Sequence, residues 1–479
     1  MPRSGSDRGK AAALNMDPDV IAKEHAAFSS GHPTLRKNYL SGLENVAQTL
    51  GTMAPAGTLG VIIPLLIGKT GNGTWLMFLA VLGICLLILV NINAFATRCA
   101  SAGGLCTYAR LGLGRRAGAA TGWIYVGAML FGAASAAPSA AYYACLVISQ
   151  YSGIPNSALL GASVTTLVVL AAWWTAFRDM KLSSDVMIII EVTSLAVMIT
   201  IIAIAMSKGG AWIDRPQLTL QGAGPRAFSA GLVLAFLTMG GFESATTLGE
   251  EATHAKRTIP RAIMACVVPV GLLYLFMTYL LVGLGRRFGI ALDQLEAPFD
   301  TLARACRFAL LGTASSAGIA LSYFACTLGS INAGARTLYS LSEDGLFFRP
   351  FGFAHPVNAT PHRAIALIGA VSIAMPVGML LWGVSLVSCI DYVSQLAALG
   401  YIGSYFMVCL AAPFFLASVG CLTRGGIAAS VAALVLLAAV LVQSVYPVPP
   451  APACYLPYVF AAAMAAGFAA SWWVQRAAA

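Results

Sequence analysis

Charged side chains are scarce in this sequence. Only 10% of the 479 residues are Asp, Glu, Lys or Arg, whereas 59% are hydrophobic, and the mean hydropathy is +0.81. Water-soluble domains carry about 25% charged residues, so a chain with so few could not cover a surface exposed to water. A lipid-embedded chain needs few charges over most of its outer wall. The composition excludes an ordinary soluble protein and predicts a membrane protein.

Residue types that build metal centres, disulfide frameworks and nucleotide sites are also few or badly placed. The five histidines are scattered, and none of the eleven cysteines forms a CxxC pair; most lie inside apolar runs as small hydrophobic residues. No glycine-rich phosphate-binding loop is present, and no cluster of His, Asp or Ser has catalytic spacing. We therefore expect no metal or other cofactor, no enzymatic activity and no use of ATP.

The net charge of +10 does not indicate a nucleic-acid partner, because Lys and Arg sit in short loops between apolar stretches. With the N-terminus in the cytoplasm, 20 of the 28 basic residues fall on the inner side. This asymmetry follows the positive-inside rule and predicts a multi-pass protein of the plasma (inner) membrane with both termini cytoplasmic. Residues 1–39 lack the pattern of a signal peptide, and we expect them to form a cytoplasmic tail.

Twelve apolar segments are each long enough to cross about 30 Å of hydrocarbon as a helix. They lie near residues 42–66, 74–97, 117–148, 157–177, 184–206, 227–249, 262–284, 308–335, 362–383, 386–415, 426–446 and 452–474. The sequence therefore predicts an all-α membrane protein with 12 transmembrane helices in contact with lipid.

Two of these segments are interrupted near their middle. The first contains Pro55 and Gly57, and the sixth contains Gly240 and Gly241. Proline removes a backbone donor and glycine adds freedom, so both helices should break inside the membrane. Backbone groups freed there are tolerated where they line a cavity or meet a ligand, as in secondary transporters built from inverted repeats. The alternative is that these residues only kink the helices.

Matching breaks in segments 1 and 6 predict a 5+5 inverted repeat, with segments 1–5 and 6–10 as the halves. Residues 40–415 would form this transport core, and 416–479 would hold two extra helices and a short cytoplasmic C-terminus. A half-helix with a free N-terminus favours a carboxylate, and one with a free C-terminus favours an ammonium or a cation. A zwitterionic amino acid presents both charges.

The residues after the second break carry a family resemblance. Residues 241–252 (GFESATTLGEEA) and 256–263 (KRTIPRAI) resemble the helix 6 signature of the amino acid–polyamine–organocation superfamily. Residues 335–346, at the end of the eighth segment, are similar to a second element of that family. The resemblance extends from about residue 38 to 445. It implies the leucine-transporter-type fold and alternating access around helices 1 and 6.

The breaks and the resemblance together imply a substrate site at the middle of helices 1 and 6. Its residues would be Met53, Ala54, Pro55, Ala56, Gly57, Thr58, Met239, Gly240, Gly241, Phe242 and Glu243. Phe242 directly follows the second break and is expected to cover the substrate. Many relatives carry a GSG-like run in helix 1 whose amides hold the substrate carboxylate, and this chain departs from it. Here Ala56, Gly57 and Thr58 would offer the amides.

Acidic residues within apolar helices are functional candidates because they are costly to insert. Glu243 could take up a proton, pair with a substrate ammonium, or tie the unwound segment to helix 1 by accepting its N–H groups. Glu191 could carry the coupling proton, since a low-dielectric surrounding disfavours its charged form, or could simply bond a neighbouring helix backbone. Glu44 and Asp391 lie near helix ends, where solvated carboxylates are expected; an outer gate contact is the alternative for Asp391.

These features favour a secondary active transporter of amino acids or related amines, working by proton-coupled symport. An exchanger of amino acids or polyamines, and a transporter-like sensor, are the alternatives. Sodium is a second candidate for the coupling ion, with Thr327 and Ser330 as oxygen donors. At the inner side, Arg336 and the charges at 250–251 and 256–257 would form either a gate of ion pairs or a solvated interface.

Overall fold

The computed structural model describes residues 32–209, 212–292, 297–446, 448 and 450–478. Most of these residues are helical, and in the described part a single parallel bridge joins Leu40 to Ala252. The first half of the chain contains α3 (Gly42–Met53), α4 (Pro55–Thr70), η1 (Gly71–Gly73), α5 (Thr74–Ala96), α6 (Leu105–Leu113), α7 (Arg115–Ser152), α8 (Ala158–Arg178), α9 (Met180–Ser207), α10 (Arg215–Leu218), α11 (Pro225–Leu237) and η2 (Ser244–Leu248). The second half contains α12 (Ala255–Phe288), α13 (Pro298–Ala305), α14 (Ala309–Glu343), η4 (Arg349–Gly352), α15 (His362–Leu381), α16 (Leu386–Ser418), α17 (Arg424–Val445), η5 (Ala453–Tyr455) and α18 (Leu456–Ala478).

The described residues hold ten helical stretches that are long and apolar enough to cross a membrane. One of them, Gly42–Ala96, contains both of the first two predicted segments. The predicted segment at 227–249 is not one long helix, because α11 ends at Leu237 and only a 3-10 turn follows. Eleven of the twelve predicted segments thus lie in candidate spans. The remaining one, the sixth segment at 227–249, is interrupted. The total of twelve crossings and the inverted repeat remain predictions.

The three longest predicted apolar segments, 117–148, 308–335 and 386–415, lie in long helices. The helices α7, α14 and α16 have 38, 35 and 33 residues. At 1.5 Å per residue each is roughly 50 Å or longer, which exceeds the hydrocarbon thickness. The connecting regions 207–226 and 285–307 contain the short helices α10 and α13.

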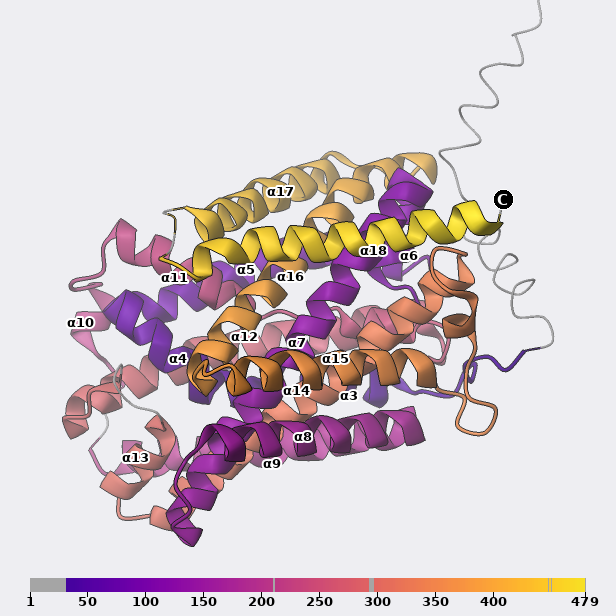
Figure 1. Ribbon diagram of the computed structural model, residues 1–479. Helices are drawn as coiled ribbons and strands as arrows, with labels where there is room; N and C mark the ends of the chain where they lie inside the picture. Colours follow the sequence, from indigo (N-terminus) through magenta and orange to yellow (C-terminus); the bar gives the residue numbers. More distant parts are fainter. Residues whose placement is uncertain (1–31, 210–211, 293–296, 447, 449, 479) are drawn as a thin grey trace, which may run out of the picture.

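The long helices form one bundle (Figure 1). Helix α7 packs against both α14 and α16 at its centre, while α17 and α18 lie on one side of the bundle, with α8 and α9 on the opposite side. Many large apolar side chains face outward, among them Leu159, Leu310 and Trp382. An apolar outer wall is what a lipid surrounding requires.

The described chain begins at the end of the bundle where α18 also ends, on the right in Figure 1. Its first residues pack across that end instead of leaving it. The amides of Tyr39 and Leu40 donate to Glu251 O at 2.7 and 2.9 Å, and the amide of Ala354 donates to Pro33 O at 3.0 Å. Residues 1–31 of the predicted tail lie outside the described residues.

Candidate functional site

The first predicted break is present as two separate helices. The helix α3 ends at Met53, and Ala54 adopts a left-handed conformation with φ 46° and ψ 61°. The helix α4 starts directly afterwards at Pro55, which suits a first helical position because its missing N–H would have no intrahelical partner. A left-handed alanine is unfavourable, so the surrounding packing must hold the break open.

The second predicted break is a longer irregular stretch. After Leu237 the chain runs through turns to η2, and Gly241 has φ +87°. A Cβ on Gly241 would lie 2.6 Å from Thr52 Cγ2 of α3, and a Cβ on Gly240 would lie 2.8 Å from the Tyr401 ring. Only glycine meets both the conformation and the close approach at Gly241.

The two breaks adjoin each other inside the bundle. The hydroxyl of Ser244, in η2, donates to Gln48 O of α3 at 3.2 Å. The Gln48 side chain in turn donates to Gly329 O of α14 at 2.8 Å. All predicted site residues are buried: Met53, Ala54, Pro55, Ala56, Gly57, Thr58, Glu191, Met239, Gly240, Gly241, Phe242 and Glu243. The fold therefore brings together the residues that the sequence analysis selected.

Backbone amides at the start of α4 bond to groups of the chain itself. The Ala56 amide donates to Glu191 Oε2 at 3.3 Å, and the Gly57 amide donates to Ser322 Oγ at 2.9 Å. Ser322 Oγ donates to Glu191 Oε1 at 2.5 Å. The Thr58 amide donates to Ala54 O at 2.9 Å. The amides expected for a substrate carboxylate are thus occupied by a carboxylate from α9, a hydroxyl from α14 and a carbonyl.

Glu243 lies beside the second break and is fully buried. Its Oε2 accepts a hydrogen bond from the Tyr405 hydroxyl of α16, which also accepts the Gly241 amide at 3.2 Å. The Tyr125 hydroxyl of α7 also lies next to this carboxylate. The link between helices 1 and 6 that the sequence analysis offered as one role of Glu243 is made by Ser244.

Aromatic rings surround this carboxylate. Phe242 is fully buried and packs against Tyr405 with ring centroids 5.2 Å apart. Tyr401 and Tyr405 stack with centroids 6.1 Å apart. The ring of Tyr323 lies within about 3 Å of the place where a Cβ on Gly57 would be. The two breaks therefore meet in a lining of phenols and one phenyl ring.

The remaining acidic candidates have local partners. Glu44 is buried and forms a capping box with Ser41 at the start of α3, so it is not the solvated carboxylate expected there. Asp391 is exposed on α16, as expected, and accepts from Gln395 at 3.0 Å.

Arg336 and Glu251 form a buried ion pair at the end of the bundle where the described chain begins. Arg336 Nε and Glu251 Oε2 lie 2.5 Å apart, and Arg336 Nη2 donates to Glu251 Oε1 at 3.1 Å. Their side chains are only 1% and 3% exposed, so this pair is not part of a solvated interface.

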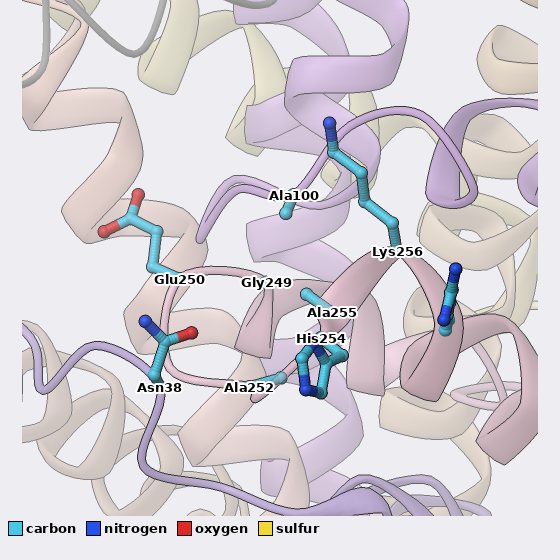
Figure 2. Close-up of a pocket in the computed structure, with 9 residues that line it drawn as sticks. Asn38, Ala100, Gly249, Glu250, Ala252, His254, Ala255 and Lys256 are labelled. Atoms are coloured by element: carbon cyan, nitrogen blue, oxygen red, sulfur yellow. The ribbon is translucent and has the colours of Figure 1, made fainter.

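A pocket of about 370 Å³ opens next to this pair, in the turn that leads into α12. Figure 2 shows Asn38 and Glu250 on one side of the pocket and His254 and Lys256 on the other. The lining includes Glu250, Lys256 and Arg257, which are three of the four charges at 250–251 and 256–257 that were predicted at the inner side. Most of its lining residues, from Gly249 to Arg257, follow η2 directly in the sequence.

Residues suited to metal binding are not gathered in the described part of the chain, where no group of three or more His, Cys, Asp or Glu could hold a metal ion. Of the two oxygen donors considered for sodium, Thr327 donates its hydroxyl to Tyr323 O at 2.9 Å. Ser330 is fully buried on the same helix.

The long apolar helices, with two interrupted helices that meet at buried carboxylates, define an integral membrane protein of the transporter class. The chain belongs to the amino acid permease family, whose profile matches residues 40–468.

Similar proteins include a low-affinity putrescine importer of Escherichia coli (strain K12), 26% identical over 66% of this chain and 69% of the importer. An uncharacterized amino acid permease of Bacillus subtilis is 23% identical over 71% of this chain and 77% of that protein. The vacuolar cationic amino acid transporter 4 of Arabidopsis thaliana is 24% identical over 73% of this chain and 60% of that protein. These relatives confirm the superfamily resemblance seen in the sequence.

Sequence reasoning missed two residues of the site, Ser322 and Tyr405. Each bonds a carboxylate that the sequence analysis had selected, Glu191 and Glu243 respectively. The signal of Ser322 was weak, because Ser and Thr hydroxyls in helices often bond the preceding turn of the same helix, as the Thr327 hydroxyl does here. Tyr405 is one of several aromatic residues in apolar helices, and most of these serve packing.

Proposed function

We propose that this protein is a secondary active transporter that moves amino acids or related amines across the plasma membrane by proton-coupled symport. The substrate would bind where the α3–α4 break meets the α11–η2 break, and alternating access would proceed around these helices. The two five-helix halves would form the core, with α17 and α18 added. Both termini would lie in the cytoplasm, which agrees with the described chain starting and ending at one end of the bundle.

The observation that carries this proposal is the position of Glu191. Its carboxylate, on α9, bonds the broken helix 1 at Ala56 and the central helix α14 at Ser322. A single buried carboxyl group that connects the three helices α9, α4 and α14 is suited to couple its protonation to a rearrangement of these helices. When neutral, it would bind the positive N-terminus of α4 less strongly, which would free that half-helix to move.

Amines and amino acids are the substrates named for several relatives, namely putrescine and cationic amino acids. The aromatic lining with the buried Glu243 carboxylate suits a cationic ammonium group, because rings and carboxylates both attract cations. Glu243 is therefore proposed as a substrate contact and as a second proton-coupling residue.

Uptake by purified protein in liposomes tests the proposal. Labelled amino acids and amines would be offered under an imposed pH gradient, under a sodium gradient, or with internal substrate only. The proposal predicts accumulation above equilibrium for one class of substrate when the pH gradient alone is present. Accumulation that needs sodium or internal substrate, in protein shown to be folded, would contradict proton-coupled symport.

A further inference from the structure

The start of α4 has no backbone donor left for a ligand. A helix leaves its first N–H groups without intrahelical partners, and these are the groups that usually bind a substrate carboxylate. Here Pro55 has no N–H, while the amides of Ala56 and Gly57 donate to Glu191 and Ser322. The next amide, of Thr58, already bonds within the helix turn.

The group on these amides is itself a carboxylate. Glu191 is fully buried and holds the position that the acid group of an amino acid would take at this break. A second carboxylate brought next to it would meet like-charge repulsion in a low-dielectric surrounding. It would also have to break the bonds from Ala56 and Ser322.

The rest of the site favours positive charge. Both α3 and α11 reach the breaks with their C-terminal ends, which carry partial negative charge. Glu243 adds a fully buried carboxylate beside the second break, next to the hydroxyls of Tyr405 and Tyr125. An ammonium group would pair with the Glu243 carboxylate and find the aromatic rings of Phe242 and Tyr405 nearby.

We infer that the substrate is an organic amine that carries no carboxylate, because the chain fills the carboxylate position of its own binding site with Glu191. The inference rests on the proposed transport function and narrows its substrate class to amines, with free amino acids excluded. Glu243 would hold the ammonium group, and Glu191 would act as the built-in anion at the start of α4.

The test compares matched pairs of compounds that differ only in the carboxylate. The pairs are 1,4-diaminobutane with ornithine, 1,5-diaminopentane with lysine, and 2-phenylethylamine with phenylalanine. Binding to the purified full-length protein is measured as thermal stabilisation over a range of concentrations, and uptake is measured in liposomes. In at least one pair, we expect the amine to bind at least about tenfold more tightly than its amino acid, and no amino acid to bind more tightly than its amine.

Two variants test whether the preference for amines over amino acids arises because the amides of Ala56 and Gly57 are already hydrogen-bonded. The double variant Glu191→Ala, Ser322→Ala exposes the amides of Ala56 and Gly57, so amino acids should gain affinity relative to their amines. The variant Glu191→Gln removes the negative charge but keeps an acceptor for the Ala56 amide, so it should retain more of the preference for amines than the double variant. Asp391→Ala, at an exposed acid of α16, is the matched control and should change neither series.

The possible results of these experiments distinguish failure of the substrate inference from failure of the proposed transport function. Amino acids that bind wild-type protein as tightly as their amines would overturn the inference and leave the transporter proposal standing. Binding by neither series would also overturn the inference. Amines that bind preferentially but are not transported under any gradient would support the cation site and refute the proposed transport function. If the double variant does not fold, the wild-type comparison still decides.

Discussion

The carboxylate of Glu191 and the amide of Ala56 are 135 positions apart in sequence and are joined by a hydrogen bond of 3.3 Å. The bond places an acidic side chain of α9 at the positive end of α4, inside the bundle. Ser322 completes the arrangement by donating to the same carboxylate. This contact is the basis for both the coupling proposal and the substrate proposal.

Replacing Glu191 by Gln should abolish accumulation driven by a pH gradient while leaving amine binding intact. Glutamine retains an acceptor for the Ala56 amide but cannot exchange a proton at neutral pH. Uptake at several external pH values measures the effect, and accumulation should fall to the equilibrium level. The exposed Asp391→Asn serves as control; full pH dependence in Glu191→Gln would remove this residue as the proton carrier.

Gly241→Val should block substrate binding by closing the second break. Valine at φ +87° is strained by about 1–2 kcal/mol or more, and its Cβ would meet Thr52 at 2.6 Å. Binding and uptake are measured together with the melting temperature in detergent. Gly83→Val is the matched control, because Gly83 is exposed on α5 and its Cβ would meet nothing within 4 Å. Normal uptake by Gly241→Val would show that the site lies elsewhere.

Tyr405→Phe should weaken the site without changing its shape. The lost hydroxyl leaves Glu243 Oε2 and the Gly241 amide without the hydrogen bonds they make to Tyr405, at a cost of about 1–3 kcal/mol. A lower melting temperature and weaker amine binding are expected. Tyr458→Phe, at a phenol 74% exposed on α18, should behave as wild type. Unchanged binding in Tyr405→Phe would separate this phenol from the site.

Arg336→Ala should destabilise the protein strongly, by about 3–5 kcal/mol, because it leaves the Glu251 carboxylate buried and unpaired. The melting temperature of the detergent-solubilised protein measures this effect. Arg304→Ala removes a partly exposed pair with Asp300 and should cost less than about 1 kcal/mol. Equal effects in the two variants would mean that the Arg336 pair is solvated.

The sequence was sufficient to predict the features that depend on local chemistry. Pro55 and Gly241 alter the backbone by their own covalent structure, so both breaks could be predicted from the chain alone. Long apolar runs likewise predicted the candidate spans, since length and composition decide whether a helix can cross lipid. The positions of Glu191 and Glu243 within such runs marked them as functional candidates.

Features that depend on which helices meet could not be predicted in this way. Nothing in the sequence near Glu191 indicates that Ser322 will face it or that the Ala56 amide will be its partner. The burial of Arg336 with Glu251 also depends on how the turn after η2 packs against α14. Amides expected to be free were therefore found bonded. Of the two alternatives for Arg336, a gate of ion pairs or a solvated interface, the buried pair with Glu251 excludes the second.

The most direct test of the account is proton movement during transport. Liposomes containing the purified protein and a trapped pH-sensitive dye would receive external 1,4-diaminobutane with no other gradient present. The account predicts that wild-type protein acidifies the interior as the amine enters, and that Glu191→Gln does not. Entry of the amine without any change of internal pH in wild-type protein would contradict proton-coupled symport.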